Sequence, residues 1–227
     1  MAKATEVIAL HSGGLDSSTL LCWLLDQGYF PRSLGVLYGQ TNWREVEKAN
    51  VFCARIGVPR QVVDLKNLGL IMTGCSLTDS SVEMPEGHYS DQSMRATVVP
   101  NRNMILLACA AAYAVSLKVS AIAYAPHVED HGTYPDCRPS FAEAMRGALA
   151  LSDYEPVELL APFIYWSKPQ IVMFGEGSKI HWEDTWTCYR SGEKHCGVCG
   201  ACSERHEAFR LAGVVDPTEY EGQNGED

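Results

Sequence analysis

Short apolar runs alternate along this chain with longer stretches in which apolar residues recur every three or four positions. The short runs predict buried β-strands, and the amphipathic stretches predict α-helices that pack one face on a core. The predicted strands cover residues 5–10, 33–38, 61–65, 120–125 and 157–160. The predicted helices cover residues 15–27, 42–56, 101–117, 140–150 and 167–174. Strands separated by crossover helices form parallel sheets, so the pattern predicts an α/β fold: an open, Rossmann-like parallel sheet with helices on both faces.

One segment, residues 68–100, departs from this alternation. It is polar, contains Gly74, Pro85 and Gly87, and has no sustained period. A loop of this length inside a compact domain is more often functional than accidental. We expect it to pass over the active site and to be partly mobile without ligand.

Length and charge narrow the class of protein. A chain of 227 residues can form one substantial domain with a small appendage. No apolar run approaches the ~20 residues that span a bilayer, and residues 1–6 lack a signal-peptide pattern. These features predict a soluble, cytoplasmic protein with no membrane partner. The net charge of −10 favours a small-molecule substrate over nucleic acid, because nucleic-acid-binding surfaces are normally basic.

The first predicted strand ends in a turn suited to phosphate. Residues 11–18 read His-Ser-Gly-Gly-Leu-Asp-Ser-Ser and lead into a helix. The glycines let the backbone approach an anion, and the helix N-terminus supplies N–H groups. The candidate phosphate-binding residues are Ser12, Gly13, Gly14, Leu15, Asp16, Ser17 and Ser18. Asp16 fits beside phosphates if a Mg²⁺ ion bridges them; a plain glycine turn with a helix cap is the alternative.

The spacing excludes two common nucleotide-binding loops. The chain lacks both the G-x-x-x-x-G-K-[ST] loop and the G-x-G-x-x-G fingerprint. Residues 12–17 instead resemble the SGGxDS signature of the PP-loop ATP pyrophosphatase superfamily. That resemblance implies that ATP is bound, cleaved between its α- and β-phosphates, and used to adenylate an oxygen of the substrate.

Four of the nine cysteines are concentrated in residues 188–202. They are Cys188, Cys196, Cys199 and Cys202. Two overlapping C-x₂-C steps with a fourth thiol upstream can surround a Zn²⁺ ion, and four cysteines leave no open position for water, so such a zinc is structural. An iron–sulfur cluster is the alternative, because four cysteines also hold those.

Polar residues follow several of the predicted strands. In an open α/β sheet, ligands bind beyond the carboxyl ends of the strands, so these positions are candidates for substrate contacts. They are Tyr38, Gln40, Arg102, Asp130, Tyr134, Asp136 and Arg138. For any one of them a purely structural role is an equal alternative: Asp136 and Arg138 could form a surface pair.

The motifs together resemble one family. They are the hexapeptide 12–17, Tyr38-Gly39-Gln40, Val99-Pro100-Asn101-Arg102-Asn103, Tyr134-Pro135-Asp136-Cys137-Arg138-Pro139, Ser167-Lys168 and Thr185-Trp186-Thr187-Cys188-Tyr189. In this order, and with the four cysteines, the chain from residue 5 to residue 218 is similar to the QueC family of 7-cyano-7-deazaguanine synthases. The resemblance implies an adenine nucleotide alpha hydrolase-like fold and an ATP-dependent C–N ligase.

The resemblance also implies the reaction. 7-Carboxy-7-deazaguanine and ammonia become 7-cyano-7-deazaguanine through an adenylated carboxylate and an amide, on the route to queuosine or archaeosine. It implies ATP and Mg²⁺, one structural Zn²⁺ held by the four cysteines, and a homodimer. The expected catalytic residues are Asp16, Arg102 and Lys168. We expect Asp130 and Asp136 to pair with the guanine-like edge, and Tyr134 to stack on its ring.

Two departures leave the acceptor of the activated carboxyl open. Residues 89–98 and 126–132 differ from the commonest family sequences, and both lie where we expect the deazaguanine. Another amine, such as a protein N-terminus, is therefore an alternative to ammonia. A tRNA-modifying PP-loop enzyme is a further alternative. The expected organisation is an ATP-binding catalytic domain at 1–180, a zinc-binding segment at 181–218 and a disordered acidic tail at 219–227.

Overall fold

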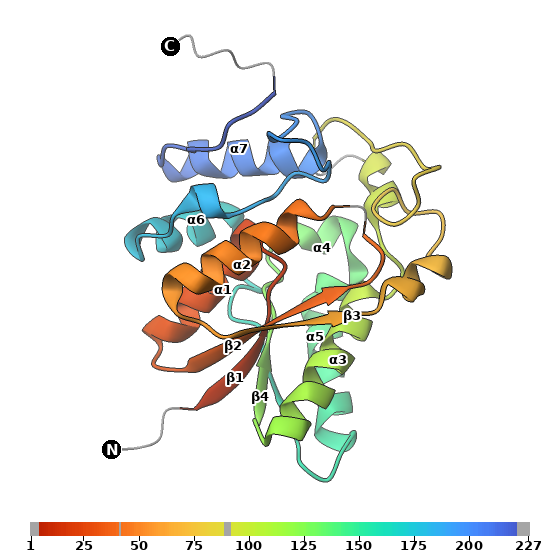
Figure 1. Ribbon diagram of the computed structural model, residues 1–227, viewed down its shortest axis with the longest axis vertical. Helices are drawn as coiled ribbons and strands as arrows, with labels where there is room; N and C mark the ends of the chain where they lie inside the picture. Colours follow the sequence, from red (N-terminus) through yellow and green to blue (C-terminus); the bar gives the residue numbers. More distant parts are fainter. Residues whose placement is uncertain (1–4, 41, 89–91, 222–227) are drawn as a thin grey trace.

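Parallel strands form the sheet at the centre of the molecule (Figure 1). This computed structural model describes residues 5–40, 42–88 and 92–221. The strands are β1 Glu6–Leu10, β2 Phe30–Leu37, β3 Arg60–Asp64, β4 Ala121–Ala123 and β5 Glu158–Leu160. Their order across the sheet is β3-β2-β1-β4-β5, and every neighbouring pair is parallel. The predicted open parallel sheet is confirmed.

Helices connect the strands and extend beyond the last of them. The α-helices are α1 Leu15–Asp26, α2 Arg44–Ile56, α3 Arg102–Leu117, α4 Asp130–Thr133, α5 Pro139–Leu151, α6 Lys168–Gly177 and α7 Gly200–Ala212. The 3₁₀ helices are η1 Lys66–Leu70, η2 Gln92–Thr97, η3 Pro135–Cys137 and η4 Trp182–Asp184. The five helices expected from the apolar period correspond to α1, α2, α3, α5 and α6.

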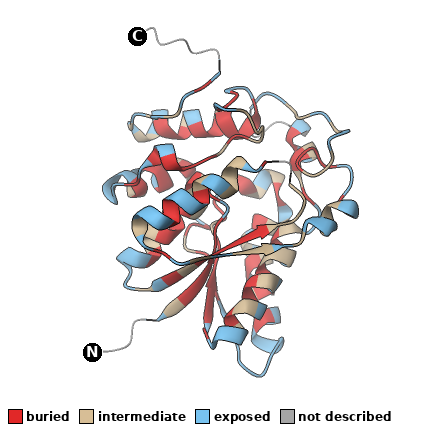
Figure 2. Ribbon diagram, viewed as in Figure 1, coloured by how far each residue is buried: buried red, intermediate tan, exposed pale blue. Residues whose placement is uncertain are grey.

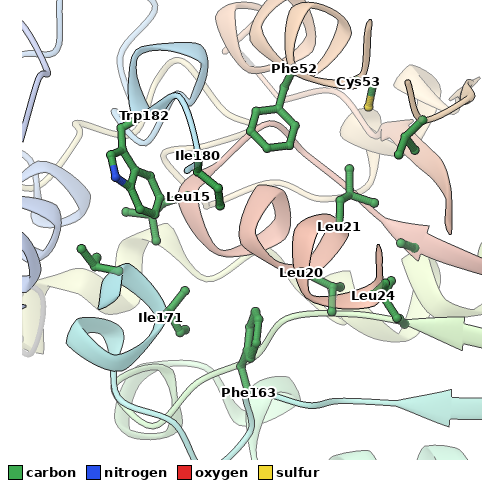
Figure 3. Packing of buried hydrophobic residues seen from close by; sticks show 14 of the residues in the cluster. Leu15, Leu20, Leu21, Leu24, Phe52, Cys53, Phe163, Ile171, Ile180 and Trp182 are labelled. Atoms are coloured by element: carbon green, nitrogen blue, oxygen red, sulfur yellow. The ribbon is translucent and has the colours of Figure 1, made fainter. Parts of the chain in front are cut away.

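Helices cover both faces of the sheet because its central strand is apolar on both sides. Val7 and Ala9 of β1 point to the face covered by α1, α2, α6 and α7, whereas Ile8 and Leu10 point to the face covered by α3 and α5. Figure 3 shows part of the first layer, where side chains of α1 and α6 lie near Phe163. Buried residues follow the sheet and the inner sides of the helices (Figure 2). The packed helix layers therefore hold the strand ends, and the loops after them, in place.

Strand β1 marks the point where the chain changes its direction across the sheet. From β1 the chain moves outward to β2 and β3, and it then crosses to β4 and β5 on the other side. The loops after β1 and β4 therefore leave neighbouring strand ends in opposite directions. In open α/β sheets, ligands bind in the crevice at such a switch point.

Strand β2 begins at Phe30, earlier than the predicted start at residue 33. It includes Pro31, although proline lacks the N–H that a central strand needs. The N–H groups of Phe30 and Ser33 donate toward β1 and β3, to the carbonyls of Thr5 and Pro59 respectively. The missing N–H of Pro31 would therefore point toward β3, which first pairs with β2 only at Ser33. No hydrogen bond of the sheet is lost.

Helix α7 does not follow from the apolar pattern. Its buried side includes Glu204 and Arg205, which interrupt the apolar period. Arg205 is fully buried and donates hydrogen bonds to Thr185, Thr187 and Asp216. The helix lies beside α6 (Figure 1), and its residues Ala208 and Phe209 belong to the same core as α1. Polar partners thus take the place of apolar contacts along part of this helix.

The long loop 68–100 packs around an apolar cluster of its own. Met72, Cys75, Leu77 and Val99 are buried together, with Tyr38 against them. Residues 89–91, which belong to one of the stretches that differ from the family, lie outside the described residues. So do residues 222–227 of the predicted acidic tail.

One segment, Ser93–Leu117, is long and apolar enough, by length and composition alone, to cross a membrane. It carries Arg95 and Arg102, and its greater part is α3. Leu107 and Ala110 of this helix are buried in the core beneath the sheet. Helix α3 thus packs one side on the sheet, and a single candidate of this kind is weak evidence for a membrane span.

Candidate active site

A cavity of about 260 Å³ lies beyond the carboxyl ends of β1, β2 and β4, at the switch point of the sheet. Its walls come from the loop after β1, the residues after β2 and β4, and the starts of α3, α6 and α7. Residues far apart in the sequence, such as Ser12, Arg102 and Glu204, therefore line one space. Leu77 of the long loop also lines it, as expected for a segment that passes over the site.

The turn after β1 and the first residues of α1 form one wall of this cavity. Gly14 is the N-cap of α1 and no side chain caps the helix, so its first N–H groups are left for a ligand. The hydroxyl oxygens of Ser12 and Ser17 lie 3.2 Å apart on the same wall. N–H groups, hydroxyls and the positive end of the helix dipole together favour an anion such as phosphate.

Gly13 shapes this turn without lining the cavity. Its φ is +106°, and a Cβ at this position would collide with the carbonyl oxygen of Glu45 on α2. The carbonyl of Gly13 accepts a hydrogen bond of 2.9 Å from the N–H of Trp186. The turn is therefore held from two sides, by α2 and by the segment that leads to Cys188.

Ser18 supports the turn from behind. It is fully buried, and its hydroxyl lies 3.1 Å from Nε2 of His11, whose Nδ1 lies 3.0 Å from the hydroxyl of Ser33. Burial and the charge of Arg60 hold the pKa of His11 well below its usual value, so the ring is neutral. Of the residues predicted to bind phosphate, those that line the cavity are Ser12, Gly14, Leu15, Asp16 and Ser17.

An ion cluster occupies the wall where α1, α6 and α7 meet. Nζ of Lys168 lies 2.8 Å from Oδ2 of Asp16 and 2.8 Å from Oε2 of Glu204. Burial opposes the charge of Lys168, but Asp16 and Glu204 outweigh it and raise the pKa of the lysine. Two of the predicted catalytic residues, the half-buried Asp16 and the buried Lys168, are thus an ion pair on the cavity wall.

Residues after β4 complete this cluster. His127 is 1% exposed, and its Nε2 lies 3.2 Å from Nζ of Lys168 and 3.4 Å from Oδ2 of Asp130. Its Nδ1 lies 3.0 Å from Oε2 of Glu129, the atom that also accepts the backbone N–H of Lys168 at 3.0 Å. Asp130 therefore lines the cavity as a neighbour of His127.

The opposite wall is aromatic and carries a guanidinium group. The central carbon of the Arg102 guanidinium lies 5.7 Å from the centre of the Tyr134 ring. The Tyr134 hydroxyl lies 2.7 Å from Oγ1 of Thr97 and 3.0 Å from the hydroxyl of Tyr189. Burial opposes the charge of Arg102, but Tyr38 and other acidic neighbours raise the pKa of the guanidinium. This wall suits a flat ring system that carries a negative charge.

Three predicted substrate contacts have structural partners. Oε1 of Gln40 accepts the N–H of Tyr38 at 2.8 Å, although both residues line the cavity. Asp136 accepts the N–H of Asn103 at 2.8 Å in the first turn of α3, and Arg138 is exposed and donates to the carbonyl of His131. Neither Asp136 nor Arg138 lines the cavity.

Two acidic side chains on the cavity wall, Glu45 and Glu204, were not singled out from the sequence. Burial raises the pKa of Glu45 to about 7, against the charge of Arg102, which lowers it. Glu45 lies in the first turn of α2, the helix that follows β2, so its position after a strand end was a usable signal. Glu204 lies two positions after Cys202 and reads as part of the cysteine segment, so nothing in the sequence pointed to the cavity.

The four cysteines meet at the N-terminal end of α7. Their sulfurs lie within 4.8 Å of one another, and all four residues are buried. The N–H groups of Arg190 and Cys199 donate to the sulfurs of Cys188 and Cys196 at 3.3 and 3.4 Å. N–H donors of this kind stabilise thiolates, and a tetrahedral zinc with Zn–S bonds of ~2.3 Å separates its sulfurs by ~3.8 Å. The cluster fits zinc in composition and spacing.

His195 lies between the cysteines in the sequence but has other partners. Its Nε2 accepts the N–H of Thr187 at 3.1 Å, and its ring packs on Trp186 with centroids 4.3 Å apart. Burial lowers the pKa of His195 to about 4, so the ring is neutral. Thr187 also lines the cavity, so the cysteine cluster and the cavity are neighbours.

Three buried polar atoms on the cavity wall have no hydrogen-bond partner among the described residues. They are Oδ1 of Asp16, Oε1 of Glu204 and the hydroxyl of Tyr124. Buried polar atoms are normally paired, so these three indicate groups that a ligand or ion supplies. Carboxylate oxygens beside a phosphate-binding turn are suitable partners for Mg²⁺.

The chain is similar to a known protein family. Residues 6–213 match the family described as "Queuosine biosynthesis protein QueC". A 7-cyano-7-deazaguanine synthase of Pseudoalteromonas atlantica is 45% identical over 216 residues, which cover 95% of this chain and 99% of the relative. One of Caldicellulosiruptor saccharolyticus is 46% identical and covers 95% and 96%. A solved 4-thiouridine synthetase–RNA complex with bound ATP shares the fold at 14% identity, with a TM-score of 0.52 over 92% of this chain and 50% of that chain.

Proposed function

This chain belongs to the QueC family and is an ATP-dependent enzyme, and from that premise we propose the reaction that it catalyses. It converts 7-carboxy-7-deazaguanine and ammonia into 7-cyano-7-deazaguanine. The observation that carries the proposal is the single cavity that the phosphate-binding turn, the ion cluster and the Arg102 wall share. Relatives at 45% identity that carry the name of this synthase support it.

The first half of the reaction activates the carboxylate. A carboxylate oxygen of the substrate attacks the α-phosphorus of ATP, and pyrophosphate leaves. The product is an acyl adenylate, which is a better electrophile than the carboxylate because AMP is a good leaving group. The free N–H groups of α1 and the hydroxyls of Ser12 and Ser17 are suited to hold the departing pyrophosphate.

The second half makes the nitrile. Ammonia attacks the acyl carbon, AMP leaves, and a proton is lost to give the primary amide. The amide oxygen then attacks the α-phosphorus of a second ATP, and pyrophosphate again leaves. Loss of AMP and of both nitrogen-bound protons then forms the triple bond. One site serves both halves because each brings an oxygen against the same α-phosphate.

The Arg102 wall is the proposed place of the deazaguanine. Tyr38, Tyr134 and Tyr189 offer a flat aromatic surface, and Arg102 offsets the charge of a carboxylate or a phosphate. Asp130 and Glu45 are carboxyl groups on the same cavity that can accept the N–H edge of a guanine-like ring. The contacts of Asp136 and Arg138 favour structural roles for these two residues.

Two metal ions complete the proposal. Oδ1 of Asp16 fits Mg²⁺, which would neutralise phosphate charge beside the turn. The four cysteines would hold one zinc per chain, and four thiolates leave it no open coordination position, so it stabilises structure. The homodimer and the cytoplasmic location implied by the resemblance stay predictions.

The proposal is tested by incubating the protein with ATP, ammonium and 7-carboxy-7-deazaguanine and following the products by mass spectrometry. We expect amide and then nitrile, with AMP and pyrophosphate released in step. Asp16→Asn should lower turnover by about 100-fold or more, since a charged group in the phosphate site is lost. Asp26→Asn, at the exposed C-terminal end of the same helix, is the matched control and should turn over normally.

The possible results separate the alternatives. Absence of both amide and nitrile overturns the proposal. Adenylation without reaction with ammonia, followed by transfer to another amine, would identify a different acceptor for the same activated carboxyl. Normal turnover of Asp16→Asn would remove the assignment of ATP to the turn after β1.

A further inference from the structure

Glu204 connects the cysteine segment with the phosphate-binding turn. It lies on α7 two residues after Cys202, in the helix whose N-cap is Cys199. Its side chain is 7% exposed, and Oε2 reaches Nζ of Lys168 on α6 at 2.8 Å. Lys168 in turn reaches Oδ2 of Asp16 on α1 at 2.8 Å. A chain of two ion pairs thus runs from α7, which carries Cys202 and is capped by Cys199, to the helix that begins at the turn.

The ammonium group of Lys168 is paired with two carboxylates. Nζ lies 2.8 Å from an oxygen of Asp16 and 2.8 Å from an oxygen of Glu204, and Nε2 of His127 lies 3.2 Å away. The backbone of Lys168 is also held, because its N–H donates to Glu129 and because Ser167 forms a capping box at the start of α6. The ammonium group is therefore directed at Asp16 and Glu204 rather than at a phosphate.

This arrangement determines how Asp16 presents its two oxygens. Oδ2 is bound to Lys168, whereas Oδ1 is buried and has no hydrogen-bond partner within the described part of the chain. Asp16 lines the cavity in the second position of α1. Because Lys168 is shared with Glu204, it holds Asp16 without cancelling the whole charge of the carboxylate.

We propose that Glu204 is a positioning residue for ATP: through Lys168 it holds the carboxylate of Asp16 in the orientation that Mg²⁺·ATP requires. This inference rests on the proposed function, in that ATP binds at the turn after β1. The cysteine segment then has a second role besides stabilising the fold, because α7 begins at the cysteines and positions Glu204 beside Lys168. The partners that orient a metal-binding carboxylate typically change metal affinity by about 10- to 100-fold when they are removed.

A purely structural role for Glu204 makes a different prediction. In that case Glu204 only compensates the buried charge of Lys168, and its loss lowers the free energy of unfolding while the folded protein still binds ATP normally. Measurements of Mg²⁺·ATP affinity and of thermal stability on the same variants therefore distinguish the two roles.

The test is isothermal titration of Mg²⁺·ATP into the zinc-loaded protein without deazaguanine. Glu204→Gln should raise the Kd by about tenfold or more, while elemental analysis finds the same zinc content as in the wild type. Glu207→Gln is the matched control, since Glu207 is on the same helix and its pair with His88 is exposed. It should bind ATP like the wild type.

A double variant shows whether Glu204 acts through Asp16. Glu204→Gln should add less than about twofold to the Kd of Asp16→Asn, because two residues that act through one contact are not additive. Full additivity, or a wild-type Kd for Glu204→Gln, overturns the proposal. If Glu204→Gln does not fold, Glu204→Asp takes its place: it keeps the charge one methylene further back, and an intermediate Kd is expected, whereas a wild-type Kd overturns the proposal.

The result is independent of the nitrile assay. Failure to form nitrile would refute the proposed reaction but leave the change in ATP affinity measurable. Normal nitrile formation with unchanged ATP affinity in Glu204→Gln would refute only the role of Glu204.

Discussion

Gly13 and Gly28 lie at the two ends of α1, and both have a positive φ, +106° and +79°. A Cβ at Gly28 would have nothing within 4 Å, whereas at Gly13 it would meet the backbone of α2. Glycine at position 28 is thus required only by the backbone conformation. Glycine at position 13 is also required by the close approach of α2 to the phosphate-binding turn.

Gly13→Ala should therefore cost more than Gly28→Ala. We expect Gly28→Ala to lower the free energy of unfolding by about 1 kcal/mol and to leave ATP affinity unchanged. Gly13→Ala adds overpacking of about 1–3 kcal/mol to the same strain, and it should weaken ATP binding because the turn is displaced. Urea denaturation and ATP titration of both variants check this. Equal losses would show that the contact with Glu45 is unimportant.

The residues of the turn could be predicted from sequence, but the role of each neighbouring polar residue could not. The SGGxDS pattern identifies residues 12–17 because glycines and hydroxyls before a helix are a chemical requirement of phosphate binding. Asp130 and Asp136 look alike in the sequence, since both follow β4 in polar stretches. Only the fold decides that Asp130 lines the cavity and that Asp136 binds the first turn of α3.

Helix α7 belongs to three environments along its length. Its N-terminal end carries Cys199 and Cys202 in the cysteine cluster, its next turn carries Glu204 at the cavity, and Phe209 lies in the core beneath α1. Apolar period predicts helices that bury one continuous apolar stripe, as α3 does. It does not predict α7, because a thiolate cluster and ion pairs supply much of its packing.

Cys202→Ser should consequently disturb both the metal site and the cavity. We expect zinc content to fall from one per chain toward zero and the melting temperature to fall by about 10 °C, since losing a structural metal costs several kcal/mol. ATP affinity should fall as well, because α7 carries Glu204. Cys109→Ser, on α3 and away from the cluster, is the control. Iron and visible absorbance in the wild type would instead assign an iron–sulfur cluster.

The protein is acidic, with a net charge of −10, yet the substrates that we propose for it are anions. The cavity meets this requirement locally: Arg102 and the N-terminus of α1 face the same space as the carboxyl groups of Asp16, Glu45 and Glu204. Net charge alone favoured a small substrate but could not locate these groups. Affinity for ATP then depends on which of the carboxyl groups are ionised.

Glu45 provides the test of this dependence. Burial raises the pKa of Glu45 to about 7, so the side chain is mostly neutral at pH 6 and mostly ionised at pH 8. Ionisation adds a negative charge to the cavity, so ATP affinity should fall as pH rises, by about fivefold for ~1 kcal/mol of repulsion. Glu45→Gln should lose this part of the pH dependence of ATP affinity. Glu47→Gln should keep it, because Glu47 is exposed on the same helix.

The pH test is read as a difference between variants, because ATP itself titrates in the same range. Titration calorimetry of the wild type, Glu45→Gln and Glu47→Gln at pH 6, 7 and 8 supplies that difference. Identical pH profiles for the three proteins would show that Glu45 does not face the bound nucleotide.

The hydrogen bond from Trp186 to Gly13 has a consequence for biosynthesis of the protein. During translation the turn after β1 is made before two of its supports, Trp186 and the Lys168–Glu204 pair, because both lie much later in the chain. The turn therefore lacks these contacts in the nascent chain until Glu204 has been made. The full set of contacts around the turn can form only after the four cysteines at 188, 196, 199 and 202 have been synthesised as well.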